Sequence, residues 1–425
     1  MTDAPSRPPL RPAVDFLFSL ERFGMKFGLA NIEALCAALG HPELSFTSIH
    51  IAGTNGKGSV AAMVDATLRA AGHRAGRYTS PHLVRLEERF VIDGEEVSPA
   101  ALDRSATRVQ QATLDLIASG TIEALPTFFE CTTAVAFDLF RDARVPAAVL
   151  ETGLGGRLDS TNIVMPALTA IVSIDFDHQA QLGNTIASIA AEKAGIAKRG
   201  APMVCGPVPA EAMDVIASVC AERGAPLILT EGDAALAARV DEIPLSLPGA
   251  HQKANAAVAL RLLELLDGDP SLALPVDAAA RRAGLSTAVW PGRLETIEHG
   301  GCRVLLDAAH NPAGARALAD HLRANGPRGA SLVFGAMKDK AVREMLAALA
   351  PIVRRIICTT AATPRAMPAD ELASYARGLG SDVQIVTDPF EAVEEGCRCD
   401  RQVVVAGSIF LIGPIRERLR RGILR

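Results

Sequence analysis

Apolar, β-branched runs alternate along the chain with stretches whose apolar residues recur at helical spacing. In the first part of the sequence these runs are "AAVLE", "LTAIVSID", "APMVCG" and "APLILT". A second series follows residue 300 and consists of "CRVLLD", "ASLVFG", "RRIICT", "VQIVTD" and "QVVVAG". Such alternation predicts an α/β fold in which helices cover both faces of parallel sheets.

The two series are separated by the segment "STAVWPGRLE", which holds the only tryptophan and a proline-glycine break. A chain of 425 residues is too long for one ordinary hydrophobic core, so we expect two domains. We place the boundary near residue 288, which gives domains of residues 1–287 and 288–425. Ligand clefts commonly form between domains, so this junction is a candidate binding site.

One strand-to-helix turn carries a nucleotide-binding signal. The stretch "IHIAGTNGKGSVAAM", residues 49–63, reads as a buried strand, a glycine-rich loop and a helix. The backbone N–H groups of such a loop converge on an anion at the helix N-terminus. Lys57 would reach the phosphates, and the hydroxyl group of Ser59 would contact the magnesium ion bound to these phosphates. The sequence therefore predicts a phosphate-binding P-loop; the alternative is a glycine-rich turn that binds nothing.

Two later strands are predicted to end in polar residues at the same edge of the sheet. The run Ala147–Glu151 ends in an acid and is followed by glycines, which indicates a magnesium ligand at Glu151. A surface turn rich in glycine is the alternative. The run that ends in "SIDFDHQ" brings Asp177 or His178 toward the same cleft. Magnesium prefers oxygen ligands, so the histidine is not expected from chemistry alone.

Composition narrows the class of protein. The formal net charge is -5 and charged residues make up 21% of the chain, so the basic excess needed for broad nucleic-acid binding is absent. Among the eight cysteines only Cys397 and Cys399 are close together, which predicts reduced thiols rather than a zinc site. The sequence shows neither a signal-peptide core nor an apolar run of roughly 20 residues. We expect a cytoplasmic monomer that binds neither nucleic acid nor membranes.

Motifs along nearly the whole chain resemble those of folylpolyglutamate synthase and the bifunctional dihydrofolate synthase, ATP-dependent amide-forming enzymes of the Mur ligase superfamily. The folate branch is indicated by "KFGLANI", "SPHLVR" and "WPGRLE". Others are "HIAGTNGKGS", "ETGLGGRLDSTN", "AEKAGI", "HQKAN", "DAAHNP", "FGAMKDK" and "GSIFLIG". The resemblance implies a P-loop ATPase domain with a mostly parallel sheet, followed by a smaller Rossmann-like α/β domain.

The resemblance also implies roles for individual residues. The residues expected to hold ATP are Thr54, Asn55, Gly56, Lys57, Gly58, Ser59, Asn255, Arg293 and Asp307, with His310 a weaker candidate. The residues expected to bind Mg²⁺, as two ions, are Ser80, Glu151 and His178. The catalytic candidates are Lys57, Lys193 and His178.

Lys193 matches a lysine that is carbamylated in this family. An unmodified ammonium group near two magnesium ions would be repelled, whereas a carbamate places a carboxylate on the same stem. From spacing alone, a lysine on the surface of a helix is the alternative.

Three segments are expected to bind the pterin substrate. They are Gly28, Leu29, Ala30 and Asn31; Thr127, Phe128, Phe129 and Glu130; and Leu158, Asp159 and Ser160. The phenylalanines suit ring stacking, and Asp159 would accept hydrogen bonds from the pterin edge. The run Arg157 to Asp159 resembles the same position in the bifunctional members of the family. The alternative is that Arg157 and Asp159 pair and brace the turn, while the phenylalanines are core residues.

The implied reaction is ATP-dependent addition of L-glutamate to 7,8-dihydropteroate and to folates. The substrate carboxylate attacks the γ-phosphorus, and the amine of glutamate then attacks the acyl phosphate. Polyglutamylation alone is one alternative. A cell-wall Mur ligase is a second, although the roughly 50 residues before the P-loop are few for its additional N-terminal domain. A non-catalytic nucleotide-binding module is a third, and it would be expected to have lost Lys57, Glu151 or His178.

Overall fold

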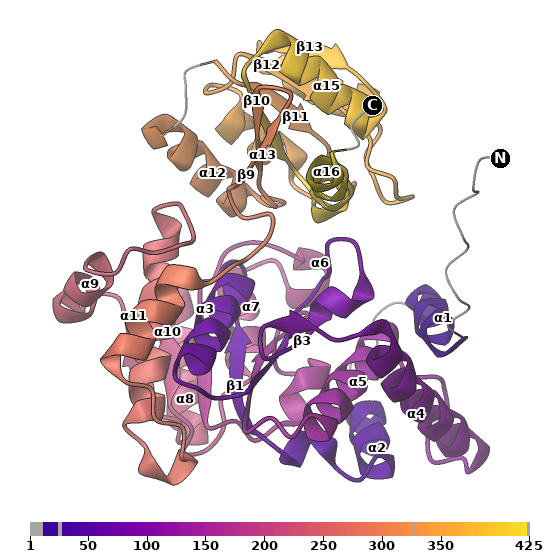
Figure 1. Cartoon of the computed structure of the whole chain (residues 1–425), viewed down its shortest axis with the longest axis vertical. Helices are drawn as coiled ribbons and strands as arrows, with labels where there is room; N and C mark the ends of the chain where they lie inside the picture. The colour runs from indigo at the N-terminus through magenta and orange to yellow at the C-terminus, as the bar shows by residue number, and fades with distance from the viewer. Residues whose placement is uncertain (1–11, 24–27, 326–328, 423–425) are drawn as a thin grey trace.

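The computed structural model describes residues 12–23, 28–325 and 329–422 of the chain. Two lobes, each built on its own β-sheet, are stacked along the long axis of the molecule (Figure 1). The lower lobe in this view contains α1 to α11, and the upper lobe contains the elements from β9 onward. Within the described ranges, no helix combines the length and the apolar character that crossing a membrane requires.

The lower lobe contains an eight-stranded sheet in the order β4-β3-β2-β5-β1-β6-β7-β8. The strands from β2 to β8 in this order are parallel, whereas β3 and β4 pair antiparallel. The strands are β1 (Thr47–Ala52), β2 (Ala75–Tyr78), β3 (Phe90–Ile92), β4 (Glu95–Glu96), β5 (Ala147–Glu151), β6 (Leu168–Ile171), β7 (Met203–Cys205) and β8 (Leu227–Leu229).

The strand order brings four loops together at one edge. β1 lies between β5 and β6, and Ile51 is paired with Glu151 on one side and with Ala170 on the other. β2 is the parallel neighbour of β5. Because parallel strands end at the same edge, the loops after β2, β5, β1 and β6 emerge side by side, where open α/β sheets bind ligands.

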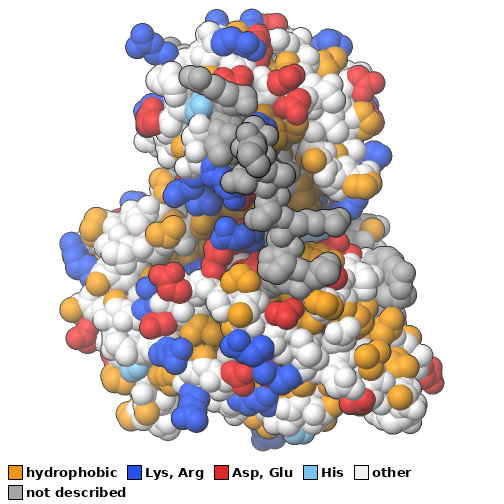
Figure 2. Space-filling model, turned by 45° about the vertical axis from the view of Figure 1, so that its right-hand side comes forward, with side chains coloured by type: hydrophobic (Ala, Val, Ile, Leu, Met, Phe, Trp, Pro, Cys, Tyr) orange, Lys and Arg blue, Asp and Glu red, His pale blue; other side chains and the backbone are white. Residues whose placement is uncertain are grey.

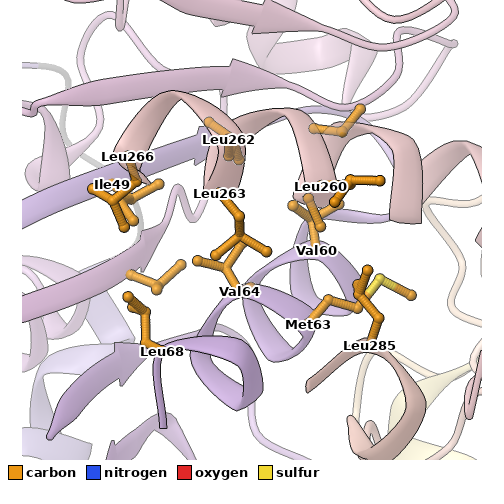
Figure 3. Packing of buried hydrophobic residues seen from close by; sticks show 14 of the residues in the cluster. Ile49, Val60, Met63, Val64, Leu68, Leu260, Leu262, Leu263, Leu266 and Leu285 are labelled. Carbon is orange, nitrogen blue, oxygen red and sulfur yellow. The ribbon is translucent and has the colours of Figure 1, made fainter. Parts of the chain in front are cut away.

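Helices cover both faces of this sheet. α3, which begins at the P-loop, packs with α10 and α11 over β1, and Figure 3 shows Val64 of α3 pointing toward Leu263 of α10. On the other face, α1, α2, α4 and α5 enclose a second core. The helices are α1 (Pro12–Ser19), α2 (Ala30–Ala38), α3 (Lys57–Ala70), α4 (Pro99–Ala118), α5 (Phe128–Asp142), α6 (Gln179–Leu182), α7 (Ile186–Ala194), α8 (Ala210–Arg223), α9 (Ala234–Asp241), α10 (His251–Asp267) and α11 (Ala278–Thr287).

The upper lobe contains a six-stranded sheet in the order β13-β12-β11-β14-β10-β9, parallel except for the edge strand β9. Apolar clusters lie on both of its faces. Its strands are β9 (Glu295–His299), β10 (Cys302–Leu306), β11 (Ser331–Phe334), β12 (Arg355–Cys358), β13 (Asp382–Ile385) and β14 (Gln402–Ala406). Its helices are α12 (Pro312–Asn325), α13 (Val342–Leu349), α14 (Ala369–Gly378), α15 (Pro389–Cys399) and α16 (Ile409–Arg421).

The predicted fold class, a mostly parallel sheet followed by a smaller α/β unit, is confirmed. Each apolar run used for the prediction contains a strand. The strands β2, β3, β4 and β9 were not predicted; β9, for example, is half-exposed and lacks a continuous apolar run. The two sheets are separated by the segment between Thr287 and Glu295. The boundary near residue 288 lies within it and stays a prediction.

Candidate active site

A cleft of about 1360 Å³ opens between the lobes and is lined by residues of both. The loops after β2, β5, β1 and β6 form its lower side. Basic residues recur along the lining, and Figure 2 shows Lys and Arg side chains at the waist between the two lobes. This charge suits anionic ligands.

The P-loop occupies the centre of the lower side. The ammonium group of Lys57 donates to the carbonyl oxygens of Gly53 at 3.0 Å and Thr54 at 3.3 Å. It also lies 3.9 Å from Oε1 of Glu151. Gly56 precedes α3 with a φ of 85°, and a Cβ there would lie 2.4 Å from Oδ1 of Asn255. Glycine therefore permits both the left-handed turn and the approach of α10 to the loop.

Three residues around the P-loop were not singled out from the sequence. Gln252 donates to the Ser59 hydroxyl at 3.3 Å and accepts from Asn255 at 2.9 Å. The ring of Trp290, from the segment between the lobes, lies where a Cβ on Gly58 would project. The Arg77 guanidinium lies 5.3 Å from the centre of that ring. The first turn of α10 and the interlobe segment thus pack directly on the P-loop.

Ser80 and Glu151 lie in direct contact. The Ser80 backbone N–H donates to Oε2 of Glu151 at 3.3 Å, and Glu151 is 5% exposed. Burial raises the pKa of Glu151, against the lowering effect of Lys57. Across the described residues, no three His, Cys, Asp or Glu side chains form a metal-holding group. Mg²⁺ is commonly held by one or two carboxylates together with phosphates and water, so the oxygens of Ser80 and Glu151 fit this ion.

Asp177 joins the lower lobe to the upper lobe. Lys340 lies 2.6 Å from its Oδ1, and Asn311 donates to its Oδ2 at 3.0 Å. Nε2 of His310 lies 3.4 Å from the same Oδ2. Burial alone would raise the pKa of Asp177, but the His310 hydrogen bond and the Lys340 charge hold it well below its usual range. Burial lowers the pKa of the neighbouring His178 to about 4, so its imidazole is neutral at pH 7.

The amide of Asn311 makes a second contact across the cleft. It donates to Oδ1 of Asn55 in the P-loop at 3.0 Å and accepts from Nδ2 of Asn55 at 3.3 Å. Asn311 and Lys340 lie within the quoted motifs "DAAHNP" and "FGAMKDK", but neither was predicted as a site residue. Their contacts depend on how the lobes meet, which the motifs do not specify.

Lys193 is not a surface lysine, because its side chain is only 4% exposed. Its amine donates to the Gly53 carbonyl oxygen at 2.9 Å, the same oxygen that accepts from Lys57. Burial, reinforced by the Lys57 charge, lowers the pKa of Lys193 to about 7. Two amines that share one acceptor thus lie at the base of the P-loop.

The upper-lobe candidates Arg293, Asp307 and His310 line the cleft, as does Asn255. Asp307 accepts from the backbone N–H groups of Leu294 and Ala309, both at 2.9 Å. Burial raises the pKa of Asp307, and the Arg293 charge opposes that rise.

The predicted pterin wall is only partly present in the cleft. The residues of that prediction that line it are Thr127, Phe128, Phe129, Leu158, Asp159 and Ser160. Phe128 stacks on Phe18 with ring centres 5.8 Å apart, and the Arg89 guanidinium lies 5.1 Å from the Phe128 ring. The Glu130 carboxylate instead accepts from the Thr127 N–H at 2.6 Å and caps α5.

The role of Asp159 as an acceptor of hydrogen bonds from a pterin stays a prediction. Its carboxylate already accepts from the N–H groups of Gly153 at 2.8 Å, Leu154 at 2.9 Å and Thr161 at 3.0 Å, and from the Thr161 hydroxyl at 2.5 Å. A carboxylate offers about four lone-pair sites, so this one is occupied by its own loop. The alternative pairing with Arg157 is also not formed, because Arg157 pairs with Glu192 at 2.8 Å.

The four residues Gly28, Leu29, Ala30 and Asn31 lie at the beginning of α2 and are not among the described residues that line the cleft. Leu29 packs instead against the core beneath α5. The first two residues of the quoted motif "KFGLANI", residues 26 and 27, lie outside the described residues. A substrate role for these four residues stays a prediction.

Comparison with known proteins places this cleft in a family. Residues 292–409 match the model of the Mur ligase, glutamate ligase domain. The chain is 37% identical to the dihydrofolate synthase/folylpolyglutamate synthase of Bacillus subtilis over 426 residues, which cover 94% of this chain and 96% of that protein.

Solved structures agree with this match. Folylpolyglutamate synthase of Mycobacterium tuberculosis, complexed with ADP and AMPPCP, is similar with a TM-score of 0.86 and 33% identity over 96% of this chain and 99% of that chain. A bifunctional folylpolyglutamate synthase/dihydrofolate synthase with Mn, AMPPNP and L-glutamate bound is similar with a TM-score of 0.82 and 31% identity over 97% of this chain and 100% of that chain. The chain therefore belongs to the dihydrofolate synthase/folylpolyglutamate synthase family of ATP-dependent ligases.

Proposed function

We propose that this protein adds L-glutamate both to 7,8-dihydropteroate and to folates, using ATP in the cleft between the lobes. The observation that carries the proposal is the meeting of Lys57, Glu151 and Lys193 at one sheet edge, directly beneath the glutamate ligase domain. The B. subtilis relative bears both activities in its name.

The P-loop would hold the ATP phosphates. Lys57 now contacts two backbone carbonyls, and exchanging these for phosphate oxygens needs only a rotation of its flexible side chain. Its charge would then offset the charge on the transferring phosphoryl group, where a single such contact is commonly worth roughly 3 kcal/mol. Asn255 and Arg293 would hold the nucleotide from the sides.

Ser80, Glu151 and His178 would hold Mg²⁺, and we propose two ions. When bound, Mg²⁺ supplies positive charge to the phosphate oxygens. Glu151 is suited to this because its Oε1 has no hydrogen bond within the described part of the chain and lies 3.9 Å from the Lys57 ammonium. The neutral imidazole of His178 keeps a nitrogen lone pair for coordination. The Mn in the bifunctional relative supports a divalent ion at such a site.

Lys193 would be carbamylated. Its amine adds to CO₂, a nitrogen–carbon bond forms and a proton leaves, so the reaction needs the neutral amine. A pKa of about 7 leaves much of this amine neutral at physiological pH. The carbamate would also end the competition of two ammonium groups for the Gly53 carbonyl.

The reaction follows from these positions. The acceptor carboxylate attacks the γ-phosphorus and releases ADP, giving an acyl phosphate. The amine of glutamate attacks the acyl carbon, and phosphate leaves with one oxygen of the original carboxylate. The chain provides positioning, charge and exclusion of water, and needs no nucleophilic side chain. The contacts of Asn311 and Lys340 with the lower lobe support the proposal that closure shields the acyl phosphate.

The pterin would lie against Phe128, Phe129 and Leu158, which line the lower cleft. Asp159 would act indirectly by holding the turn at Gly153 and Leu154. We further propose a cytoplasmic, monomeric enzyme with domains of residues 1–287 and 288–425. The cleft already draws its lining from both lobes of one chain, which supports function as a monomer.

The test is phosphate release with ATP, Mg²⁺, L-glutamate and either 7,8-dihydropteroate or a reduced folate. We expect release that depends on both glutamate and the acceptor, with dihydrofolate formed from dihydropteroate. Extension of reduced folates without any dihydrofolate would reduce the function to polyglutamylation. Failure with both acceptors would overturn the proposal.

A further inference from the structure

The loop that follows β2 carries Ser80 at its start and is held rigidly at its other end. One carboxylate, that of Glu88 in the short 3-10 helix η3 (Leu86–Arg89), accepts three successive backbone N–H groups. These belong to Leu83 at 2.6 Å, Val84 at 3.2 Å and Arg85 at 2.9 Å. The path of the loop at Leu83 is therefore fixed by the lower lobe itself.

The Leu83 side chain crosses to the other lobe. It is half-buried and packs against the apolar cluster of the upper lobe that includes Leu411 and Ile412 of α16. Of the residues that the structure describes before residue 288, Leu83 alone joins this cluster. Hydrophobic contacts of this kind fix geometry through shape, because displaced side chains leave voids.

Backbones also meet closely at this point. A Cβ on Gly413 would lie 2.3 Å from the Leu83 carbonyl oxygen and 2.9 Å from the carbonyl carbon. Pro414 follows Gly413 within α16 and separately favours a residue without a Cβ before it. A Cβ on Gly292, in the interlobe segment, would lie 3.8 Å from Cδ1 of Leu83. Leu83 thus sits in a corner formed by α16 and the segment between the lobes.

The loop of Leu83 and the two segments around it each carry a residue of the candidate active site. Ser80 lies in the same loop as Leu83 and contacts Glu151. Gly292 immediately precedes Arg293, which lines the cleft. Ser408 caps the N-terminus of α16 and also lines the cleft. Leu83 therefore lies where its own loop, the interlobe segment and α16 come together.

We propose that Leu83 is a positioning residue that sets how the glutamate ligase lobe closes over the acyl phosphate. This inference rests on the proposed function. Leu83 touches no reacting atom; it acts by aligning the loop of Ser80, the segment of Arg293 and helix α16. Removing its side chain loosens the closed arrangement, so water reaches the acyl phosphate and glutamate is less well placed for attack.

The test compares Leu83→Ala with Leu83→Met and with Leu44→Ala. Methionine keeps the volume of leucine, and Leu44 is an exposed leucine of the lower lobe that is not among the residues lining the cleft. Released phosphate and amide product are measured together. For Leu83→Ala we expect amide turnover to fall by roughly tenfold or more, since small misplacements have large effects on rate. The phosphate released per amide should rise and the KM for glutamate should increase, and the KM for ATP should also increase, because Ser80 and Arg293 are proposed to hold magnesium and the nucleotide.

Leu83→Met and Leu44→Ala should behave like the wild type in all four quantities. Thermal unfolding of each variant separates misfolding from misalignment, and Leu83→Val provides a milder truncation if alanine destabilises the fold. An unchanged ratio of phosphate to amide in folded Leu83→Ala or Leu83→Val, with unchanged turnover, would overturn the proposal. Absence of glutamate-dependent phosphate release in the wild type would instead reject the underlying function.

Discussion

Glu151 and Asp159 are two buried carboxylates in and after the same strand, β5, yet their surroundings differ. Glu151 accepts one long hydrogen bond of 3.3 Å, from Ser80, and has Lys57 3.9 Å away. Asp159 accepts four hydrogen bonds of 2.5 to 3.0 Å from its own loop. Burial raises the pKa of both. Glu151 thus keeps acceptor capacity for a ligand, whereas Asp159 uses its capacity to hold the turn.

The same contrast separates the two regions of the lower cleft. At the P-loop, Lys57 and Lys193 contact backbone carbonyls that a ligand can replace. Along the predicted pterin-binding side of the cleft, the Glu130 carboxylate caps α5 and the Asp159 carboxylate holds its own turn. We therefore expect substitutions at the P-loop to affect catalysis without stability, and substitutions at the wall to affect stability first.

The largest effect is expected for Lys57→Ala. Loss of the charge that faces the transferring phosphoryl group should lower kcat by at least about 10²-fold. The melting temperature should stay within about 2 °C, because Lys57 makes no apolar core contact. Lys253→Ala is the matched control, since this lysine on α10 is exposed and pairs only with Asp241. Near-normal turnover of Lys57→Ala would contradict the assignment of the phosphate site.

Lys193→Ala is expected to lose most activity as well, and a small carboxylate such as acetate in the assay should restore part of it. The added ion replaces the oxygens of the proposed carbamate. Activity of the wild type should also rise with bicarbonate and with pH through about 7, where the amine becomes neutral. An intact mass without the added CO₂ in active, bicarbonate-equilibrated protein would count against carbamylation.

Glu151→Gln tests whether Glu151, unlike Asp159, serves a ligand rather than the fold. The amide keeps the shape but removes the charge, so kcat should fall by roughly 10-fold to 10²-fold and respond weakly to Mg²⁺. The free energy of unfolding should stay constant or rise, because the native carboxylate is buried with few partners. A loss of stability matching the loss of activity would show that Glu151 is a structural residue.

The sequence predicted the two regions unequally. The P-loop motif determines its own local structure, so the place of Lys57 followed from pattern alone. The place of Glu151 followed from the apolar run that it ends. The burial of Lys193 required α7 to pack against the P-loop, which spacing does not show. The commitment of Asp159 depends on where the N–H groups of Gly153 and Leu154 point, a property of the folded turn.

Contacts across the cleft were the least predictable. Asn311 reaches Asn55, and Leu83 reaches α16, only because the two lobes meet in one arrangement. Similarly, Leu29 was expected in the substrate pocket, but an apolar residue beside a core is also suited to packing there, as Leu29 does just before α2. Motif resemblance supplied candidate residues, and tertiary packing decided which of them face the cleft.

Asp159→Asn is expected to act on stability first. The amide replaces an acceptor oxygen by a donor and leaves buried N–H groups of Gly153 or Leu154 unpaired, which costs about 2 kcal/mol. Urea unfolding measures this loss, and residual turnover below the unfolding transition should exceed that of Glu151→Gln. Full stability with lost dihydropteroate activity would instead support direct contact with the pterin.

The smallest effect is expected at His50, which contacts the Thr161 hydroxyl that donates to Asp159. The Thr161 hydroxyl donates to Asp159, so it accepts from Nε2–H of His50 at 2.7 Å, and Nδ1 of His50 is buried without a partner. Burial lowers the pKa of His50 to about 3. Between about pH 6.5 and 3 the unfolded state binds a proton that the folded state does not, so stability falls with falling pH. Urea unfolding at pH 7 and at pH 5 gives the loss of unfolding free energy on acidification. This loss should be smaller for His50→Gln than for the wild type, and an equal loss in both proteins would reject this linkage.

Phosphoryl transfer to the acceptor carboxylate is the step on which the proposed function depends, and an isotope experiment follows this step. Dihydropteroate with both carboxylate oxygens labelled with ¹⁸O is converted with ATP and L-glutamate, and the released phosphate is analysed by mass spectrometry. The account predicts one ¹⁸O atom in each phosphate and one in each new amide, because the attacking oxygen leaves with the phosphoryl group. Unlabelled phosphate accompanied by labelled amide product would contradict the acyl-phosphate route.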